Sequence, residues 1–399
     1  MSLFLQDYIK LRRIGEGAFA SIWKVQHKSL GYVRAIKVLN ATIEDEHDDA
    51  YQTFLKECRV LLQLGNGCHP HIMRVYQPRL VDNRALVEMD YVEGRTMTEV
   101  LKETPFLPID EVYRFIREIG SALAYCHVDI YRFMMNPAED HLELDPHNAR
   151  QYLISPEKEQ ELIRKYGITH NDLHSNNVMR RDYDGSYVLL DFGLAIQDKQ
   201  CVKSSSQRDG APEYKAPEKW ESADITPRTD VYSWGVMMYE ALAGRPPFVC
   251  DVKAAKSREE AIYKVSKDHL ETPPPPIFPF RQTAFEKMYP GQTYEQDYPE
   301  ELEQVILKCL AKHPEDRYAN VKEVLTSLPL GGGQEGAALS PQLAAALAEN
   351  HRLKQEIEDL QQTIRNLAAS IGGSQTANSS PAPAPAPPPT PQLSGVLFE

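Results

Sequence analysis

Four groups of residues have types and spacings suited to holding phosphate groups and a metal ion. The first is a glycine-rich turn, Gly15-Glu16-Gly17, between two strand-like runs. Glycine accepts positive φ and carries no Cβ, so backbone N–H groups there can approach phosphate oxygens. Because the turn joins two strands rather than a strand and a helix, it argues against a dinucleotide-binding Rossmann site.

The second group is a lysine and a glutamate that could act together. Lys37 ends the run Ala35-Ile36-Lys37 on the third expected strand, and Glu57 follows twenty residues later in a helix-like segment. An ammonium group at this place would bind phosphate oxygens, and the glutamate would hold it in position. Either residue alone is more often a solvated surface charge, so the interpretation depends on the pair.

The last two groups supply oxygen atoms and a base. Asp172 and Asn177 lie five residues apart in one loop, where an aspartate can accept a hydroxyl proton and an asparagine can coordinate Mg²⁺. Asp191 directly follows the strand-like run 187–190 and would offer a second metal contact. The four groups therefore converge on phosphoryl-transfer chemistry.

Hydrophobic periodicity indicates the elements that must position these groups. In the first part of the chain, period-two alternation predicts strands at 8–15, 21–29, 32–39, 71–77 and 84–92, and helical periodicity predicts one helix at 54–64. After residue 92 the pattern is helical, with short strands at 176–181 and 187–193 and helices at 111–127, 233–244, 300–313 and 320–328. A β-rich lobe followed by a helical lobe is an α+β arrangement.

Composition excludes several classes of protein. The 399 residues carry 44 Lys+Arg against 57 Asp+Glu, a net charge of -13, which argues against a protein that mainly coats nucleic acid or an anionic membrane. The six cysteines form no C-x-x-C pair, so neither a disulfide scaffold nor a zinc module is expected. There is no apolar run long enough for a transmembrane helix, and Asp7 and Lys10 interrupt any secretory leader. We expect a cytoplasmic protein.

The last seventy residues differ from the rest in composition. Residues 339–371 keep a heptad register with Ile357 and Ile364 at position a, Leu353 and Leu360 at position d, and Asn350 at another a position. This pattern is typical of a parallel two-stranded coiled coil and predicts a homodimer. The alternative is a lone amphipathic helix packed on the body. Residues 372–399 form a proline-rich tail, with seven of the 29 prolines in 381–391, and we expect the tail to be disordered.

The four groups resemble the eukaryotic-type (Hanks-type) Ser/Thr protein kinase family. The run 210–218, which ends in Ala216-Pro217-Glu218, is similar to the end of an activation segment. The run 230–235 is similar to the start of the central buried helix, and Arg317 stands where the family places an arginine that pairs with this glutamate. The resemblance covers about residues 8–328 and implies a bilobal fold, with an N-lobe at 8–92 and a C-lobe at 93–328.

The resemblance implies ATP and Mg²⁺ as cofactors and transfer of the γ-phosphoryl group to a hydroxyl. It assigns Asp172 to the acceptor hydroxyl, Asn177 and Asp191 to the metal ions, and Lys37, oriented by Glu57, to the phosphates. Met89 would be the gatekeeper, and the Asp90 carbonyl and Val92 amide would bind the adenine edge. The implied ATP-binding residues are Ile14, Gly15, Glu16, Gly17, Ala18, Phe19, Ala20, Ser21, Ile22, Ala35, Lys37, Met89, Asp90 and Val92.

Residues 170–177 resemble the catalytic loop of the family, and this loop departs from the family pattern at its centre. Asn171 replaces the usual arginine before Asp172, and a neutral side chain cannot bind a phosphorylated activation loop by a charge-assisted bond. We therefore expect activity that does not require phosphorylation of the serines at 204–206. His174 replaces the usual lysine, and Ala211 replaces the usual threonine. Both changes fall around the acceptor hydroxyl, so His174 is a catalytic candidate that could place a proton or positive charge there; the alternative is that His174 is merely tolerated.

Three functions fit this pattern. A Ser/Thr protein kinase is favoured, because the run 213–218 is closer to the Ser/Thr than to the tyrosine-kinase form. The spacing of Asp172, His174 and Asn177 also resembles small-molecule kinases of the aminoglycoside phosphotransferase type, but these lack a segment ending in Ala-Pro-Glu. A non-catalytic scaffold is disfavoured because the residues of all four groups are present.

An insertion separates the helix that ends at Cys126-His127 from the catalytic loop. It covers about residues 128–166 and carries eight acidic against five basic residues. Asp145-Pro146 and Ser155-Pro156 are typical helix starts, so two short helices are expected, at 146–153 and 156–166. The insertion is either an ordered surface elaboration or a docking or autoregulatory element, and the proline-rich tail is a second candidate for docking a partner.

Overall fold

The computed structural model describes residues 7–16, 20–45, 47–66, 69–145, 148–192, 195–197 and 211–329. The chain divides into two units, 1–330 and 331–399. The second unit lies outside the described residues, and with it the predicted coiled coil and the proline-rich tail. The tip of the glycine-rich turn at 17–19 and the serines at 204–206 also lie outside them.

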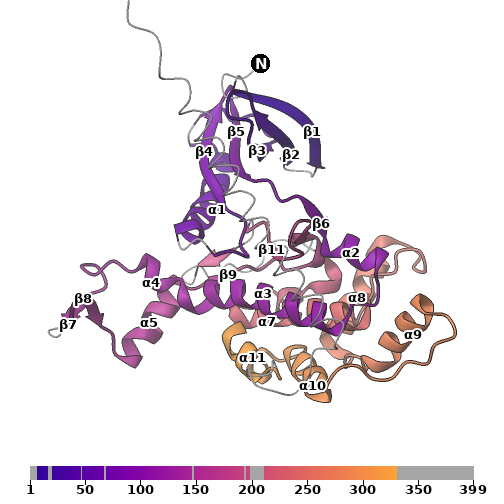
Figure 1. Ribbon diagram of the computed structural model, residues 1–399. Coiled ribbons are helices and arrows are strands. Elements are labelled where there is room, and N and C mark those ends of the chain that lie inside the picture. The colour runs from indigo at the N-terminus through magenta and orange to yellow at the C-terminus, as the bar shows by residue number, and fades with distance from the viewer. Residues whose placement is uncertain are drawn as a thin grey trace, which may run out of the picture. The chain divides into compact units, whose positions relative to one another are not determined.

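The first lobe is an antiparallel sheet with one helix, as the sequence predicts. The strands follow the order β1-β2-β3-β5-β4 (Figure 1) and are β1 (Tyr8–Glu16), β2 (Ala20–His27), β3 (Val33–Leu39), β4 (Val75–Val81) and β5 (Arg84–Asp90). The helix α1 (Asp49–Asn66) packs on β4 and β5. The strand expected at 71–77 begins four residues later than predicted, because the residues before it pair instead with the second lobe: Met73 N–H donates to the Leu189 carbonyl at 2.9 Å.

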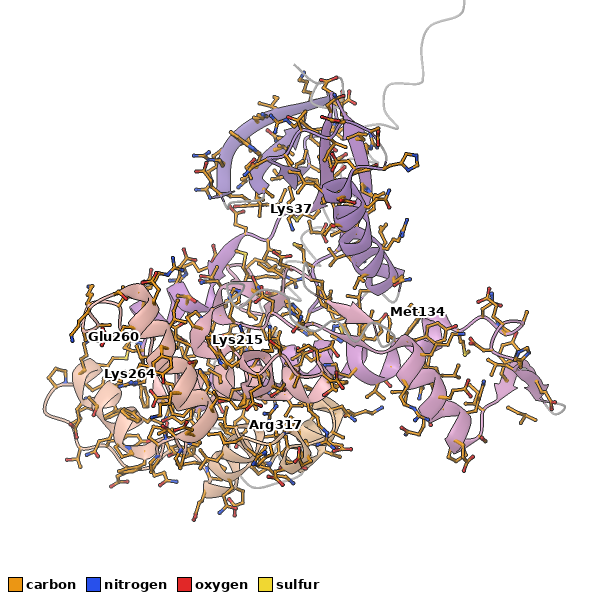
Figure 2. The ribbon with its side chains drawn as sticks, turned by 180° about the vertical axis from the view of Figure 1, so that it is seen from behind. Lys37, Met134, Lys215, Glu260, Lys264 and Arg317 are labelled. Carbon is orange, nitrogen blue, oxygen red and sulfur yellow. The ribbon has the colours of Figure 1, made fainter. Side chains whose placement is uncertain are left out.

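Strand alternation divides the side chains of this sheet between two apolar clusters. Ala35, Val87 and Met89 belong to the main core, whereas Ile36 and Leu86 belong to a smaller cluster on the opposite face. Because successive side chains of a strand point to opposite faces, Lys37 shares the face of Ala35. The alternation of β3 therefore directs Lys37 toward the second lobe, and Figure 2 shows Lys37 at the side of the sheet that faces this lobe.

The second lobe is built around one buried helix, α7 (Pro227–Ala243). Thr226 caps its N-terminus, and the helix ends at Gly244, whose φ of +76° is the left-handed conformation that glycine tolerates. Around α7 lie α3 (Ile109–Ala124), α9 (Phe278–Met288), α10 (Glu300–Cys309) and α11 (Val321–Ser327). Further helices of this lobe are α2 (Met97–Glu103), α6 (Pro217–Trp220) and α8 (Arg258–Glu271).

Short strands line the junction of the two lobes. One three-stranded sheet has the order β11-β10-β6, from β6 (Gly94–Thr96), β10 (Val178–Arg181) and β11 (Tyr187–Leu189). A second pairs β9 (Ile168–Thr169) with β12 (Ile196–Gln197). A sheet-rich lobe and a helical lobe joined in this way confirm the predicted α+β, bilobal architecture.

The insertion forms an arm with its own small core, and one of its predicted elements is wrong. The strand β7 (Glu143–Asp145) pairs antiparallel with β8 (Asn148–Leu153), where a helix over 146–153 was expected. An Asp-Pro pair favours turn initiation as well as a helix start, and here the strand pairing prevails. The second helix is confirmed as α5 (Pro156–Tyr166), capped by Ser155, whose Oγ accepts from Lys158 N–H at 3.2 Å.

The arm leaves the second lobe through an unusual helical turn. The chain after α3 continues as a π-helical turn, η2 (Tyr125–Asp129), and then as α4 (Tyr131–Met134). Tyr131, Leu162 and Tyr166 form the apolar core of the arm, and the nearby buried Asp140 accepts hydrogen bonds from the Tyr166 hydroxyl at 2.8 Å and from Lys165. In both figures this arm projects away from the rest of the lobe.

A buried ion pair ties the segment before α7 to the end of the second lobe. The Arg317 guanidinium donates two parallel bonds of 2.9 Å to the Glu218 carboxylate, and its side chain is completely buried. It also donates to the carbonyls of Ala311 and Lys312, at 2.7 and 2.9 Å. The pairing predicted from the sequence is thus confirmed. Within the described ranges, none of the helices combines the length and the apolar composition needed to cross a bilayer.

Breaking this ion pair should destabilise the protein strongly. Arg317→Met leaves the Glu218 carboxylate buried without its cation, and we expect the free energy of unfolding to fall by about 3–5 kcal/mol. Lys322→Met is the matched control, because Lys322 pairs with Asp129 at 3.0 Å on the surface and should cost less than about 1 kcal/mol. Urea unfolding measures both values, and equal losses in the two variants would contradict the assignment.

Candidate active site

A cavity of about 510 Å³ lies at the junction of the two lobes and is lined by nine of the predicted site residues. Its lining includes the predicted residues Ile14, Ile22, Ala35, Lys37, Met89, Asp90, Val92, Asn177 and Asp191. Gly15, Glu16, Ala20 and Ser21 flank the turn between β1 and β2 but do not line the cavity. Asp172 and His174 lie outside the lining too, on the loop that leads to Asn177.

The apolar walls of the cavity include residues that sequence reasoning missed. They are Leu61, Met73, Val75, Val87, Met179 and Leu190, which come from both lobes. Val87 could have been found from the alternation of β5, since it shares a face with Met89. Met179 and Leu190 carry no local signal, because only the joining of the lobes brings them to the cavity. Such walls suit a flat apolar ring system.

Lys37 and Asp191 meet across the cavity. Lys37 Nζ lies 3.6 Å from Asp191 Oδ1, although 154 residues separate them. Asp191 has a φ of +37°, in the left-handed region that is uncommon for residues other than glycine. Glu57 lies in α1, but its side chain is outside the described part of the structure, so its pairing with Lys37 stays a prediction.

The catalytic loop is held by a buried carboxylate of α7. Asp230 accepts the backbone N–H of His170 at 2.6 Å and that of Asn171 at 2.8 Å, and it lies 2.9 Å from His127 Nε2. Asn171 has a φ of +64°, so the loop turns sharply just before Asp172. Burial alone would raise the pKa of Asp230, but the hydrogen bond and charge of His127, followed by His170, hold it below its usual value.

The loop places the predicted base beside a histidine. Asp172 Oδ2 lies 3.8 Å from His174 Nε2, and the Asp172 carbonyl accepts from Asn177 Nδ2 at 2.9 Å. Burial alone would raise the pKa of Asp172, but His174, His170 and Lys219 together lower it. Asp172 is therefore held as a carboxylate, ready to accept a hydrogen bond from a hydroxyl group.

The oxygen atoms at the cavity fit a metal ion that is shared with a phosphorylated ligand. Asn177 supplies an amide oxygen and Asp191 a carboxylate, both beside the ammonium group of Lys37. Across the described ranges, no three His, Cys, Asp or Glu side chains gather into a metal cage. Mg²⁺ is commonly bound by one or two protein oxygens together with phosphate oxygens and water, and this donor set matches that preference.

Comparisons of the sequence with a family model and with curated proteins agree on one family. The model of the protein kinase domain family matches residues 8–135 and 133–328. A probable serine/threonine-protein kinase of Clostridium acetobutylicum is 23% identical over 316 residues, 79% of this chain and 38% of that protein. The probable serine/threonine-protein kinase PknB of Lactococcus lactis is 24% identical over 328 residues, 82% of this chain and 42% of that protein. The serine/threonine-protein kinase Pkn1 of Myxococcus xanthus is 27% identical over 348 residues, 86% of this chain and 38% of that protein. The chain thus spans about two fifths of the length of these curated relatives.

The role of Asp230 can be tested through the pH dependence of stability. Asp230→Asn removes a charge that binds two backbone N–H groups, so we expect the free energy of unfolding at pH 7 to fall by about 2–3 kcal/mol. Because the folded-state pKa is lowered, the difference from wild type is fully present above the unfolded-state pKa of about 3.9. It shrinks as the pH falls through the folded-state pKa.

Urea unfolding of both proteins between pH 7 and pH 3 measures this difference. Asp224→Asn, at an exposed position, is the control and should show no difference at any pH. A difference between wild type and Asp230→Asn that stays constant down to pH 3 would show that the charge of Asp230 does not hold the loop.

Proposed function

Because the chain belongs to the protein kinase family, we propose that it transfers the γ-phosphoryl group of ATP to serine and threonine hydroxyls of proteins. One observation carries the proposal. Lys37, Asn177 and Asp191 line a single cavity, and the loop that bears Asp172 is joined to Asn177 by a hydrogen bond of 2.9 Å. The proposed phosphate binder, the two proposed metal ligands and the proposed base thereby come together from three separate parts of the chain.

In this proposal the cavity binds the nucleotide. Ala35 and Met89 contact the adenine ring, whose edge bonds to the Asp90 carbonyl and the Val92 amide. Lys37 holds the phosphates, with Glu57 as its proposed partner, and the glycine-rich turn covers them. When bound by Asn177 and Asp191, Mg²⁺ supplies positive charge against the phosphate oxygens.

Asp172 acts on the acceptor hydroxyl. Its lowered pKa keeps it ionised, so it accepts a hydrogen bond from the hydroxyl and directs the oxygen lone pair at the phosphorus. The proton passes to Asp172 as the new P–O bond forms, and the bond between the γ-phosphorus and the leaving ADP oxygen breaks. His174, 3.8 Å from this carboxylate, can place a hydrogen-bond donor beside the transferred group.

Protein substrates are favoured over small molecules by the segment that precedes α7. The turn η4 (Pro212–Tyr214) and α6 form a platform beside the catalytic loop, and Arg317 anchors it through Glu218. A small acceptor requires no such platform. The relatives at 23–27% identity are also named as protein kinases. A non-catalytic scaffold would have no need of Lys37 and Asp191 placed together.

The proposal extends to location and to partners. A cytoplasmic location is supported by the scattered cysteines, which do not have the pattern of a disulfide scaffold. The arm formed by the insertion, with its own core and exposed Phe133 and Leu153, is a candidate docking element, as is the proline-rich tail.

Loss of the base should abolish transfer while the fold is retained. With γ-labelled ATP, Mg²⁺ and casein as a general acceptor, we expect Asp172→Ala to lower the rate by a factor of about 10²–10⁴. The label in casein should appear as phosphoserine and phosphothreonine. A variant with alanine at Ser204, Ser205 and Ser206 is the control and should keep the wild-type rate, because Asn171 offers no charge to a phosphorylated loop.

Three results of this assay would contradict the proposal. Equal labelling by wild type and Asp172→Ala would show that Asp172 is not the catalytic base. If small hydroxylated acceptors added in place of casein are labelled and casein is not, the small-molecule kinase would be favoured over the protein kinase. Loss of activity in the triple alanine variant would show that loop phosphorylation is needed.

We also propose that residues 339–371 join two copies of the chain as a coiled coil, which would raise the local concentration of one kinase domain near another. Light scattering of the full chain at micromolar concentration should give the mass of a dimer. Leu353→Asp with Leu360→Asp, at the predicted d positions, should give a monomer. Gln355→Asp with Gln362→Asp, at outward f positions, should remain dimeric, and a monomeric wild type would disprove the interpretation.

A further inference from the structure

A buried carboxylate at the far end of α7 binds two hydroxyl groups from different segments. Glu240 Oε2 accepts from the Tyr214 hydroxyl at 2.6 Å and from Ser175 Oγ, and the Tyr214 hydroxyl lies 3.2 Å from Ser175 Oγ. Ser175 belongs to the turn η3 (Ser175–Asn177) of the catalytic loop, and Tyr214 ends η4. One carboxylate oxygen therefore joins α7, the catalytic loop and the platform segment.

Among the described residues, this buried carboxylate has no ion-pair partner. Glu240 is 8% exposed and Ser175 is 1% exposed. No ion pair to Glu240 is formed by any Lys or Arg side chain in the described ranges. Burial raises the pKa of Glu240, and the bonds from Ser175 and Tyr214 partly offset this effect. Placing a carboxylate here has a cost in stability, which suggests a use other than stability.

His174 lies between the groups that this network holds. It directly precedes Ser175, and its ring centroid is 6.2 Å from that of Tyr214. On its other side Nε2 is 3.8 Å from Asp172 Oδ2. Nδ1 of His174 is buried and has no hydrogen-bond partner among the described residues. The ring is thus oriented by its backbone and its neighbours rather than by a hydrogen bond of its own.

We infer that the hydroxyl of Ser175, bound to Glu240 together with Tyr214, is a positioning group that holds His174 against Asp172 in the acceptor site. The inference rests on the proposed phosphoryl transfer. Binding both hydroxyls to one oxygen fixes the separation between the backbone that carries His174 and the aromatic ring that flanks it. Loss of either bond lets the imidazole turn away from Asp172, and small displacements of reacting groups have large effects on rate.

The position of the His174 ring can be followed independently of catalysis. The ring lies between Asp172 on its own loop and Tyr214 on η4. With the centroids of the His174 and Tyr214 rings 6.2 Å apart, protons of the two rings are close enough for a nuclear Overhauser contact. When the imidazole turns away from Asp172, this contact should be lost.

Two measurements test the inference, and the first does not need an active protein. The His174 ring signals are assigned by their loss in His174→Ala, and the nuclear Overhauser contact between the His174 and Tyr214 rings is measured. Ser175→Ala should abolish this contact. Ser175→Thr, which keeps the hydroxyl, should restore it. An unchanged contact in Ser175→Ala would overturn the inference even if the enzyme proves inactive.

The second measurement uses the casein assay. Ser175→Ala should lower kcat by roughly tenfold and leave KM for ATP within about twofold of wild type, since the nucleotide cavity is untouched. Ser175→Thr should recover most of kcat. In a His174→Ala background, Ser175→Ala should have no further effect, because the group that it positions is gone.

The outcomes separate this inference from the proposed function. A wild type that transfers no phosphate refutes the proposed function but leaves the contact between the His174 and Tyr214 rings to decide the positioning. An active wild type in which Ser175→Ala has the same effect on kcat with and without His174 refutes the positioning and leaves the proposed function intact. Thermal unfolding of Ser175→Ala within a few degrees of wild type excludes a general loss of structure.

Discussion

The carboxylate of Asp230 is the interaction on which the site depends. Its two oxygens bind the backbone N–H groups of His170 and Asn171 and contact His127. These donors are buried at the base of the loop, and leaving them unsatisfied would cost about 1–3 kcal/mol each. With them bound, Asp172 follows at a fixed place, and Asn177 closes the loop by donating to the Asp172 carbonyl. Side chains at the cavity are thus positioned by a residue that does not touch it.

The same helix acts a second time through Glu240. Asp230 and Glu240 stand near the two ends of the buried helix α7, one holding backbone groups and the other the hydroxyls of Ser175 and Tyr214. A site built on a rigid element keeps its geometry better than one built on loops alone. Arg317 fixes the segment that precedes this helix through Glu218. The loop 170–177 and the segment that precedes α7 therefore depend on one helix and one ion pair.

Sequence reasoning predicted those parts of the protein that depend on local pattern. Period-two alternation located the strands that carry Lys37 and Met89, and motif spacing located Asp172 and Asp191. It failed where two local signals compete, as at Asp145-Pro146, which begins a helix in one context and a turn in the other. It also missed Met179 among the cavity walls and the bond between Ser175 and Glu240. The latter joins residues 65 positions apart, and no periodicity or spacing marks such a contact before the chain is folded.

The backbone contacts of Asn171 show how the loop is held without a charged side chain at this position. Its backbone N–H donates to Asp230 at 2.8 Å, and its backbone carbonyl accepts from Lys219 Nζ at 2.5 Å. Both main-chain groups are held by side chains of the second lobe, so the turn before Asp172 is fixed without any charge on residue 171. These contacts support the expectation that the loop does not need an arginine bound to a phosphorylated residue. The backbone conformation also explains why an asparagine is suited to this position. With a φ of +64°, residue 171 adopts the left-handed conformation, which asparagine accepts more readily than arginine.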